Sequence, residues 1–347
     1  MKKILINMIS ESEISVRGHG VHTAYLELVK ALEARDDCKV VVNTFAKPVN
    51  ADITHIHTIG ALSLSKLLFG RGKKVISAHV VPDSLVGSIA LAKFWLPIAK
   101  AYMKFFYRRG DKVLAVSGMV ANILEKDLGV SNKKIEITHN TIDTSQYKTN
   151  SNDKEASRKK LGVPSEKFVV VGNGQIQPRK RFDSFVDMAQ SLPDIYFIWI
   201  GGIPFKNIGA DYKKMQNLIE SAPKNVHITG VIDLEDVKTY LQASDVFVLP
   251  AEQENHPMAV IEAAAVGLPI ILRDIPEYDD TFGGDIVRCV AQNDFVEAIE
   301  HLRTDNTMYK KFVSASQKIA HRFDSMIGAE QMVQIYKSLL KNKEFAL

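Results

Sequence analysis

The chain has 347 residues, of which 46% are hydrophobic and 24% are charged. These values are typical of a globular protein of about two domains, and they exclude a disordered chain and a collagen. No apolar run reaches the 18 residues that a transmembrane helix needs. Two cysteines, Cys38 and Cys289, are too few for a disulfide framework, and they indicate buried thiols in a reducing cytoplasm.

Charge is divided unevenly along the chain. Residues 1–150 hold 21 basic and 13 acidic residues, a net charge of +8, whereas the remainder holds 23 and 27, a net charge of −4. A cationic half indicates contact with an anionic surface. The charge alone leaves nucleic acid, anionic lipid and chance open.

Short apolar runs alternate with amphipathic stretches in the first 150 residues. The stretch Thr23–Ala34, with apolar residues at 24, 28, 29 and 32, predicts a helix. Alternation of strands and helices predicts a doubly wound α/β sheet. The predicted buried parallel strands are Ile4–Met8, Val40–Val42, Ile53–Ile56, Lys74–Ala78 and Lys112–Val116.

The alternation stops in the polar segment 147–160 and then restarts. We therefore expect two doubly wound domains, residues 1–150 and 151–325, with a last helix at about 326–347 that docks back on the first domain. Two such sheets facing each other would form a central cleft at the carboxyl ends of their strands, where ligands bind. The expected elements of the second domain are strands Phe168–Gly172, Tyr196–Gly201, Val226–Thr229, Val246–Pro250 and Pro269–Leu272, and helices Phe182–Ser191, Tyr212–Ser221, Leu234–Ala243 and Met258–Val266.

Two carboxylates lie eight residues apart across a strand-to-helix turn. Glu254 follows the predicted strand 246–250, and Glu262 lies in the first turns of the helix 258–266. A helix N-terminus offers unpaired N–H groups and partial positive charge, which suit a phosphate or polyhydroxyl ligand. A carboxylate can accept hydrogen bonds from two sugar hydroxyls. Taken alone, both glutamates could equally be helix-start acids without a ligand.

This segment resembles the Glu-x7-Glu signature, E-G-F-P-x-x-x-x-E-A-x-A-x-G-x-P, of the retaining GT-B glycosyltransferases, the glycogen-synthase-like group. The resemblance implies two doubly wound Rossmann-like domains, with Glu254 beside the donor sugar and Glu262 on the ribose of the nucleotide. It also places the turn between them, Asn255, His256, Pro257 and Met258, against the donor. The matching residues are Glu254, Pro257, Glu262, Ala263, Ala265, Gly267 and Pro269, whereas Asn255 replaces glycine and His256 replaces an aromatic residue.

The loop after the strand 168–172 is rich in glycine and basic residues, which can approach and neutralise a phosphate. It is similar to the family's G-R-L-x-x-x-K-G stretch, which holds the diphosphate, and Gly174 and Lys180 match. Gln175 stands where the family has arginine, and Arg179 or Arg181 is the alternative source of that charge. The competing interpretation is a solvated basic loop. The sequence contains no G-x-G-x-x-G dinucleotide fingerprint after either first strand.

Two features of the first domain extend the resemblance. Gly18 and Gly20 resemble the glycine-rich loop that packs against the donor phosphates, although a tight turn is equally consistent with them. His79 ends a predicted strand and resembles the histidine near the reacting sugar, whereas a structural histidine is the alternative. His55 and His57 resemble the family's D-I-x-H-x-H strand and are expected to be scaffold, because the sequence offers no nearby cysteine or acid to complete a zinc site.

The resemblance implies a retaining, nucleotide-sugar-dependent hexosyltransferase. Glu254, Lys180 and His79 are the residues expected to act in catalysis. Lys180, the glycine amides and the helix beginning near Met258 are placed to stabilise the leaving diphosphate. The sequence has no Asp-x-Asp motif, so we expect neither a metal nor a cofactor beyond the UDP-sugar co-substrate.

The segment Ser88–Arg109 predicts a helix with a basic and an aromatic side. At 100° per residue four of its cations, Lys93, Lys100, Lys104 and Arg108, fall within about 80° of one another, opposite a set of apolar residues. Such a helix favours an anionic membrane interface. The alternative is a helix that packs its apolar face on the sheet, and Pro97 complicates a straight helix. The expected lipid contacts are Lys93, Phe94, Trp95, Lys100, Lys104, Phe105, Arg108 and Arg109.

The opening Gly18–Tyr25 looks most like the bacterial diglycosyldiacylglycerol synthases. That resemblance implies UDP-galactose or UDP-glucose as donor, monoglucosyldiacylglycerol as acceptor, an α-linked product, and a cytoplasmic protein peripheral on the inner face of the cell membrane. Three alternatives remain: an enzyme of the same fold for a capsule, teichoic-acid or other soluble acceptor, a nucleic-acid-binding module, and a non-catalytic sugar-nucleotide binder. The nucleic-acid alternative leaves Glu254 and Glu262 unexplained, and we expect no nucleic-acid partner.

Overall fold

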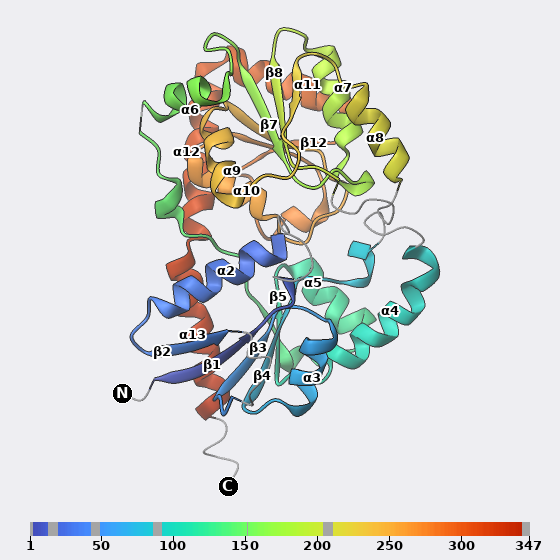
Figure 1. Ribbon diagram of the computed structural model, residues 1–347, viewed down its shortest axis with the longest axis vertical. Helices are drawn as coiled ribbons and strands as arrows, with labels where there is room; N and C mark the ends of the chain where they lie inside the picture. The colour runs from blue at the N-terminus through green and yellow to red at the C-terminus, as the bar shows by residue number, and fades with distance from the viewer. Residues whose placement is uncertain are drawn as a thin grey trace. The chain divides into compact units, whose positions relative to one another are not determined.

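The computed structural model describes residues 3–12, 20–42, 49–85, 92–150, 152–203 and 211–341. The chain divides into two units, each built on a six-stranded parallel sheet with helices on both faces (Figure 1). This confirms the two doubly wound α/β sheets expected from the alternation of strands and helices. Unit 1 holds the described residues up to Leu85, Lys93–Asp143 and those from Phe323 onward, and unit 2 runs from Thr144 to Arg322.

Unit 1 has the strand order β2-β1-β3-β4-β5-β6. Its strands are β1 (Ile4–Ile9), β2 (Cys38–Val42), β3 (Ile53–Ile56), β4 (Lys73–Ala78), β5 (Lys112–Ala115) and β6 (Ile135–Ile137), and its helices are α2 (Gly20–Glu33), α3 (Ala61–Phe69), α4 (Ala92–Tyr107), α5 (Gly118–Asn122) and α13 (Ser325–Lys341).

Unit 2 has the strand order β12-β11-β10-β7-β8-β9. Its strands are β7 (Val169–Asn173), β8 (Tyr196–Ile200), β9 (Val226–Ile228), β10 (Val246–Leu249), β11 (Ile270–Arg273) and β12 (Val287–Cys289), and its helices are α6 (Asp153–Leu161), α7 (Phe182–Ser191), α8 (Tyr212–Glu220), α9 (Leu234–Gln242), α10 (Met258–Val266), α11 (Gln292–Thr304) and α12 (Asn306–Arg322).

The strands of unit 1 pack against one helical layer on each face of the sheet, because successive side chains of a strand point to opposite faces. Ile53 and Val75 pack with α2 and α13, whereas Ile56 and Ile76 pack with α3, α4 and α5. Burial on both faces explains why these strands are continuous apolar runs in the sequence. The layer of α3, α4 and α5 is the one that carries the candidate lipid-facing helix.

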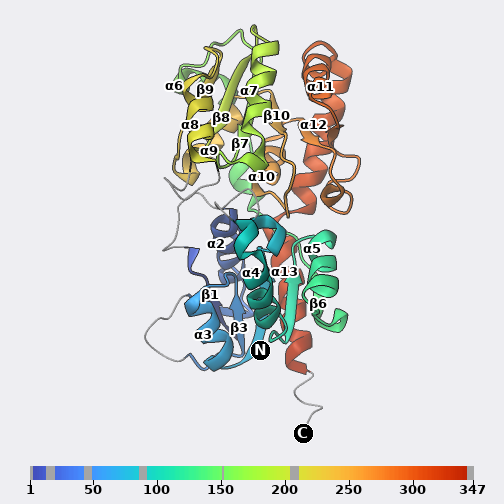
Figure 2. The same cartoon turned by 90° about the vertical axis from the view of Figure 1, so that its right-hand side faces the viewer.

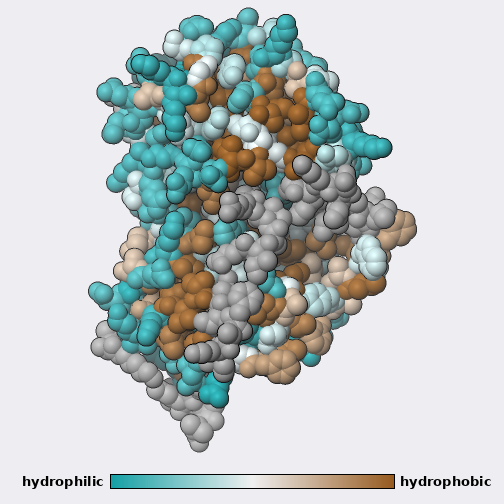
Figure 3. All heavy atoms as spheres, viewed as in Figure 1, coloured by the Kyte–Doolittle hydropathy of each residue, from teal (hydrophilic) through white to brown (hydrophobic). Residues whose placement is uncertain are grey.

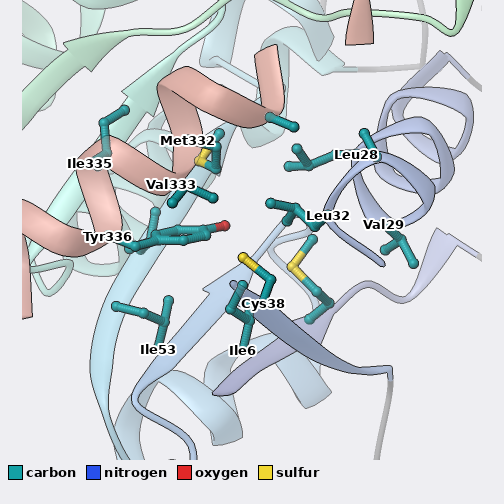
Figure 4. Close-up of a cluster of buried hydrophobic side chains, with 14 of the residues drawn as sticks. Ile6, Leu28, Val29, Leu32, Cys38, Ile53, Met332, Val333, Ile335 and Tyr336 are labelled. Atoms are coloured by element: carbon teal, nitrogen blue, oxygen red, sulfur yellow. The ribbon is translucent and has the colours of Figure 1, made fainter. Parts of the chain in front are cut away.

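The last helix belongs to the core of the first sheet. In Figure 4, Val333 and Tyr336 of α13 lie over strand residues that include Ile6 and Ile53. Figure 2 shows α12 in unit 2 and α13 in unit 1, although only two residues separate them in the chain. Cys38 lies in the same core, and Cys289 is buried in unit 2 as a second free thiol.

Two of the four edge strands of the described sheets, β6 and β12, are absent from the elements predicted from sequence. Each has only three residues with a charged residue in the middle, Glu136 in β6 and Arg288 in β12. Such short runs carry too little apolar pattern to indicate a strand. Their pairing partners β5 and β11 supply the register that the local sequence lacks.

The polar segment 147–160 is not wholly irregular, since it contains most of helix α6. Acidic residues in its first turn and basic residues in its last turn complement the helix dipole, and Gly162 ends it with a φ of 67°. Arg158 is buried and donates to Asp245, to Ala243 O and to Ser165 O. A buried arginine therefore anchors this helix, and an apolar pattern could not have revealed it.

Candidate functional site

The strand order of unit 2 places two loops where ligands of open sheets bind. The order reverses between β7 and β10, which pair directly. Ligands sit outside the carboxyl ends of the strands at such a reversal. The loop after β7 carries Gly174 and Lys180, and the loop after β10 carries Glu254. The two motifs identified in the sequence therefore meet at the reversal point of one sheet.

Lys180 and Glu254 form an ion pair at this point. The Lys180 ammonium donates to Glu254 Oε1, and Arg179 Nη1 lies 3.6 Å from the same oxygen. The two paired side chains are only 12% and 7% exposed. Arg179 also joins the loops, because its Nη1 donates to Gln253 O (3.1 Å) and its carbonyl accepts from Glu252 N (2.9 Å). The loop after β7 therefore holds two cations against the carboxylate of the other loop.

Burial lowers the pKa of the Lys180 ammonium, and the nearby carboxylate of Glu254 opposes this shift. A desolvated ammonium needs an anionic partner, because leaving a buried charge unpaired costs several kcal/mol (about 3–5). Glu254 supplies the negative charge in this structure. Any further anion that approached Lys180 would be stabilised by the same ammonium.

Glu262 lies in α10 and is also buried. Its Oε2 accepts from Asn173 Nδ2 at 3.3 Å, and Asn173 is the last residue of β7. Asn173 was not identified from the sequence. Its position between Gly172 and Gly174 at a strand end is the signal that could have revealed it.

The glycine loop after β7 is held by residues of β8 and its following turn. Trp199 Nε1 donates to Gly174 O at 2.9 Å, and Gly174 N donates to Ile200 O at 2.9 Å. Gly201 has a φ of 126°, and a Cβ there would lie 2.3 Å from Gly174 O. Trp199 and Gly201 therefore fix the path of the loop, although nothing in their local sequence indicates this role.

Gln175 does not supply the positive charge that an arginine would give at its position. The two arginines that could supply it instead, Arg179 and Arg181, have different partners in the structure. Arg181 donates to Asp183 and to Glu252. Arg179 instead lies against the carboxylate of Glu254. The Gln175 side chain accepts from Gln177 Nε2 at 3.0 Å. Arg179 is therefore the better placed of the two to act beside Lys180.

The turn between the two glutamates offers mainly its backbone. The side chains of His256, Pro257 and Met258 are buried, and His256 stacks on Phe282 with ring centroids 5.6 Å apart. Asn255 is half-buried, and its Oδ1 accepts from Gln253 Nε2 at 3.0 Å. Because Met258 begins α10, this turn lies at a helix N-terminus, where the helix dipole favours negative charge.

Three histidines lie together at the carboxyl ends of β3 and β4 in unit 1. His57 Nδ1 is 3.2 Å from His79 Nε2, and the His55 and His57 rings lie 4.3 Å apart. His55 is fully buried and hydrogen-bonds Tyr336 of α13 and Ser77 of β4, which gives it the scaffold role expected for it. Of the two loop glycines, Gly20 begins α2 and Gly18 lies outside the described residues.

Burial of this histidine cluster makes the stability of the protein depend on pH. Burial lowers the pKa of His55 from 6.5 to about 3 and that of His57 well below 6.5. The unfolded chain therefore binds more protons than the folded one below pH 6.5, so stability is present above that pH and is lost as pH falls. Between pH 7 and 5, His55 alone should lower the free energy of unfolding by about 2 kcal/mol.

Urea denaturation at pH 7 and at pH 5 measures this loss. His55→Gln should make the pH dependence shallower, because it removes the ring whose pKa burial lowers. An equal stability at both pH values would show that these rings are not held neutral by burial.

A small pocket beside the histidines has room for water rather than a sugar. It is lined by His57, His79 and His139 among others and has a volume of about 30 Å³. This is enough for about one or two water molecules. His57 Nε2 is buried with no hydrogen-bond partner among the described residues, so a water here would satisfy it. The described part of the chain holds no cluster of three or more histidine, cysteine or acidic residues suited to a metal ion.

Helix α4 presents an apolar face to solvent. Phe94 is 79% exposed, and Trp95 and Ile98 are each 63% exposed. Figure 3 shows apolar side chains gathered where α4 lies. Pro97 lies within α4 and does not divide it. Within the described ranges, no helix combines the length and apolar character that crossing a bilayer requires.

The other faces of α4 separate core residues from cations. Met103, Phe106 and Tyr107 are buried against the sheet, so Phe106 is not part of the exposed face. Arg109 lies over the ring of Phe105, which is 41% exposed. The Lys93 side chain lies outside the described residues. Four of the cations that were expected to contact lipid are exposed: Lys100, Lys104, Arg108 and Arg109.

A second exposed apolar group, not identified from the sequence, ends helix α3. Phe69 is 83% exposed and Leu68 is 44% exposed. The exposed Arg71 follows two residues later. Helix α3 shares a hydrophobic cluster with α4, so both helices cover the same face of the sheet. The signal in the sequence is an apolar pair at the end of a helix, immediately before glycine and basic residues.

Two family models match the chain in succession. The model described as Glycosyltransferase Family 4 matches residues 41–146, and the model described as Glycosyl transferases group 1 matches residues 153–319. The second range includes Lys180, Glu254 and Glu262.

Relatives and solved structures agree with these matches. The chain is 32% identical over 340 residues to the alpha-galactosylglucosyldiacylglycerol synthase of Streptococcus pneumoniae, covering 96% of this chain and 88% of the relative. It is 24% identical to the processive diacylglycerol alpha-glucosyltransferase of Acholeplasma laidlawii, over 79% and 80% of the two chains. The structure of Anabaena HepE in complex with UDP and glucose is similar with a TM-score of 0.77 and 18% identity, over 97% and 100%.

Proposed function

The chain belongs to the GT-B glycosyltransferases with a group 1 domain, and from this premise we propose that it makes an α-linked diglycosyldiacylglycerol. Membership makes it a nucleotide-sugar-dependent hexosyltransferase. The donor in our proposal is UDP-galactose or UDP-glucose, and the acceptor is monoglucosyldiacylglycerol in an anionic membrane. The names of the two diacylglycerol-specific relatives support this choice of acceptor.

The ion pair at the reversal point of the strand order in unit 2 supports the proposed binding site for the UDP-hexose donor. Lys180, assisted by Arg179, binds the diphosphate, because both cations lie on the loop whose glycine permits close approach of the backbone. Glu262 accepts from the ribose hydroxyls, with Asn173 orienting its carboxylate. Glu254 accepts from hydroxyls of the donor hexose once the diphosphate engages Lys180.

The reaction in this proposal retains the configuration at the anomeric carbon. The bond between the anomeric carbon and the diphosphate oxygen breaks, and the acceptor hydroxyl oxygen bonds to that carbon from the same face. The acceptor proton passes to the departing diphosphate, and UDP leaves. Lys180, Arg179 and the N–H groups at the start of α10 stabilise the charge that develops on the diphosphate. We propose that His79, in unit 1, contacts the acceptor.

The exposed side chains of α4 support the proposal that the acceptor lies in a membrane. An isolated soluble protein gains nothing from exposing Phe94, Trp95 and Ile98 on one helix, whereas their insertion into a lipid interface removes them from water. Neighbouring cations, Lys100 and Lys104 among them, suit anionic headgroups. Phe69 adds a second apolar contact. We therefore place the protein at the inner face of the cell membrane as a peripheral protein.

One experiment tests the proposal directly. Purified protein is incubated with UDP-[¹⁴C]glucose or UDP-[¹⁴C]galactose and with anionic vesicles containing monoglucosyldiacylglycerol, and the product is identified by mass spectrometry and α-glycosidase digestion. We expect an α-linked dihexosyl lipid from one donor. Vesicles without the glycolipid are the control.

Other outcomes select among the alternatives. Transfer to a water-soluble saccharide, with no product from the glycolipid, would support a soluble acceptor and refute the lipid proposal. Tight UDP-hexose binding without transfer to any acceptor would indicate a non-catalytic binder. A β-linked product would refute retention, because the UDP-hexose donors carry an α-linkage.

A further inference from the structure

Helix α4 is joined to the loops after β3 and β4 by two tyrosines. The hydroxyl of Tyr102 donates to Ile59 O, and the hydroxyl of Tyr107 donates to Val80 O at 2.6 Å. Tyr107 is fully buried, and Tyr102 is half-buried. Both bonds run from side chains of one helix to backbone carbonyls just beyond two neighbouring strands.

The two carbonyls belong to loops that each carry a histidine: Ile59 shares its loop with His57, and Val80 shares its loop with His79. Val80 directly follows His79, and Ile59 lies two residues after His57. The two histidines contact each other, with His57 Nδ1 3.2 Å from His79 Nε2. The helix that exposes aromatic residues to solvent is therefore bonded, through two tyrosines, to both sides of the histidine pair.

Packing alone does not call for these hydroxyls. Phenylalanine would fill the same space, and a buried tyrosine hydroxyl is tolerated only when it finds a partner. Phe106, between the two tyrosines in sequence, performs the packing role with no hydroxyl. The specific property that tyrosine adds at positions 102 and 107 is a fixed distance between the helix and each loop.

We propose that Tyr102 and Tyr107 are positioning residues that hold the His57–His79 pair at a set height above the lipid surface on which α4 rests. This inference depends on the proposed function, because it assumes an acceptor embedded in a bilayer. The headgroup of such an acceptor projects a fixed distance from the membrane plane. A protein anchored through α4 must therefore hold its acceptor loops at a matching height.

The loop after β3 has a second attachment, so loss of one tyrosine bond should move the loop rather than unfold it. Glu11 accepts from Leu62 N at 2.6 Å and from the hydroxyls of Thr58 and Ser63 at 3.1 and 3.0 Å. These bonds fix the loop to β1 and to the start of α3. Tyr102 contributes the connection to α4, which Glu11 cannot supply.

The test compares two presentations of one acceptor headgroup. Tyr102→Phe, Tyr107→Phe and the double variant are assayed with monoglucosyldiacylglycerol in anionic vesicles and with a short-chain, monodisperse analogue. We expect kcat/KM for the vesicle acceptor to fall about 30-fold in the double variant, which corresponds to about 2 kcal/mol for the two lost hydrogen bonds. The short-chain acceptor is not fixed at a membrane surface, so kcat/KM for it should be unchanged. Sedimentation of the variants with vesicles should also be unchanged.

Tyr309→Phe is the matched control. Its hydroxyl also donates to a backbone carbonyl, Asp245 O at 3.0 Å, but within unit 2. It should leave both acceptors unaffected. Equal losses on both acceptors, or no loss on either, would overturn the positioning role while the proposed function stands. Absence of glycolipid transfer by the unmodified protein would instead overturn the proposed function, and this inference with it.

Discussion

Replacing Lys180 by alanine should lower kcat/KM for the UDP-hexose by about 10²–10³-fold, the loss typical when one group that stabilises transition-state charge is removed. The ammonium is desolvated and belongs to the loop where we place the diphosphate, so a water molecule cannot replace it. Its loss also leaves Glu254 buried with Arg179, 3.6 Å away, as the neighbouring cation. UDP release in a coupled steady-state assay measures the effect.

Lys154→Ala is a closely matched control for this prediction. Lys154 forms an ion pair with Asp245, and Arg158 bonds the same carboxylate, so the arrangement repeats that of Lys180, Glu254 and Arg179 within unit 2. It lies on α6, outside the loops that follow β7 and β10. Its removal should reduce thermal stability slightly and leave kcat/KM intact. Equal turnover by the Lys180→Ala variant and the unmodified protein would refute the diphosphate assignment.

Replacing Phe94, Trp95 and Ile98 together by serine should weaken binding to anionic vesicles by roughly 100-fold. Full burial of one such side chain is worth about 1.5–3 kcal/mol, and partial insertion of each at about 1 kcal/mol gives this factor. These residues are exposed, so the substitutions remove no packing from the core of unit 1. Vesicle sedimentation measures binding, and transfer to the vesicle acceptor should fall in parallel.

Val231→Ser with Val290→Ser controls for a general loss of surface apolarity. Both valines are exposed, at 61% and 69%, and both belong to unit 2. This variant should sediment with vesicles as the unmodified protein does. If the α4 variant also sediments normally, the lipid-contact assignment is wrong, and the exposed aromatic residues of α4 require a different partner.

The succession of strands and helices along the chain could largely be predicted, because most strands are buried on two faces and form apolar runs. Helices Phe182–Ser191 and Met258–Val266 have the bounds that the sequence predicts, and Gly267, with a φ of 92°, ends the second of them. The edge strands β6 and β12 could not be predicted, because their pairing comes from a neighbouring strand. Helix α6 was missed for a different reason: its inward contact is the guanidinium of Arg158.

In the candidate donor site, too, some residues could be predicted from the sequence and others could not. Glu254, Glu262 and Lys180 were singled out because they match the motifs of the GT-B glycosyltransferases, whereas taken alone the two glutamates could equally be helix-start acids. Trp199 and Asn173 were not identified, because each acts through a contact made across strands: Trp199 on Gly174 O, and Asn173 on Glu262. The motifs therefore predicted the charged groups, whereas the residues that orient them became visible only with the sheet assembled.

The distribution of tryptophan has a practical consequence. The chain has only two, and they occupy different units: Trp95 is exposed on α4, and Trp199 bonds the loop that carries Gly174. Fluorescence from the first should shift to the blue when the indole enters lipid, and fluorescence from the second should respond to a nucleotide beside the glycine loop. Single-tryptophan variants, Trp95→Phe and Trp199→Phe, would thus give each binding event its own optical signal without an attached dye.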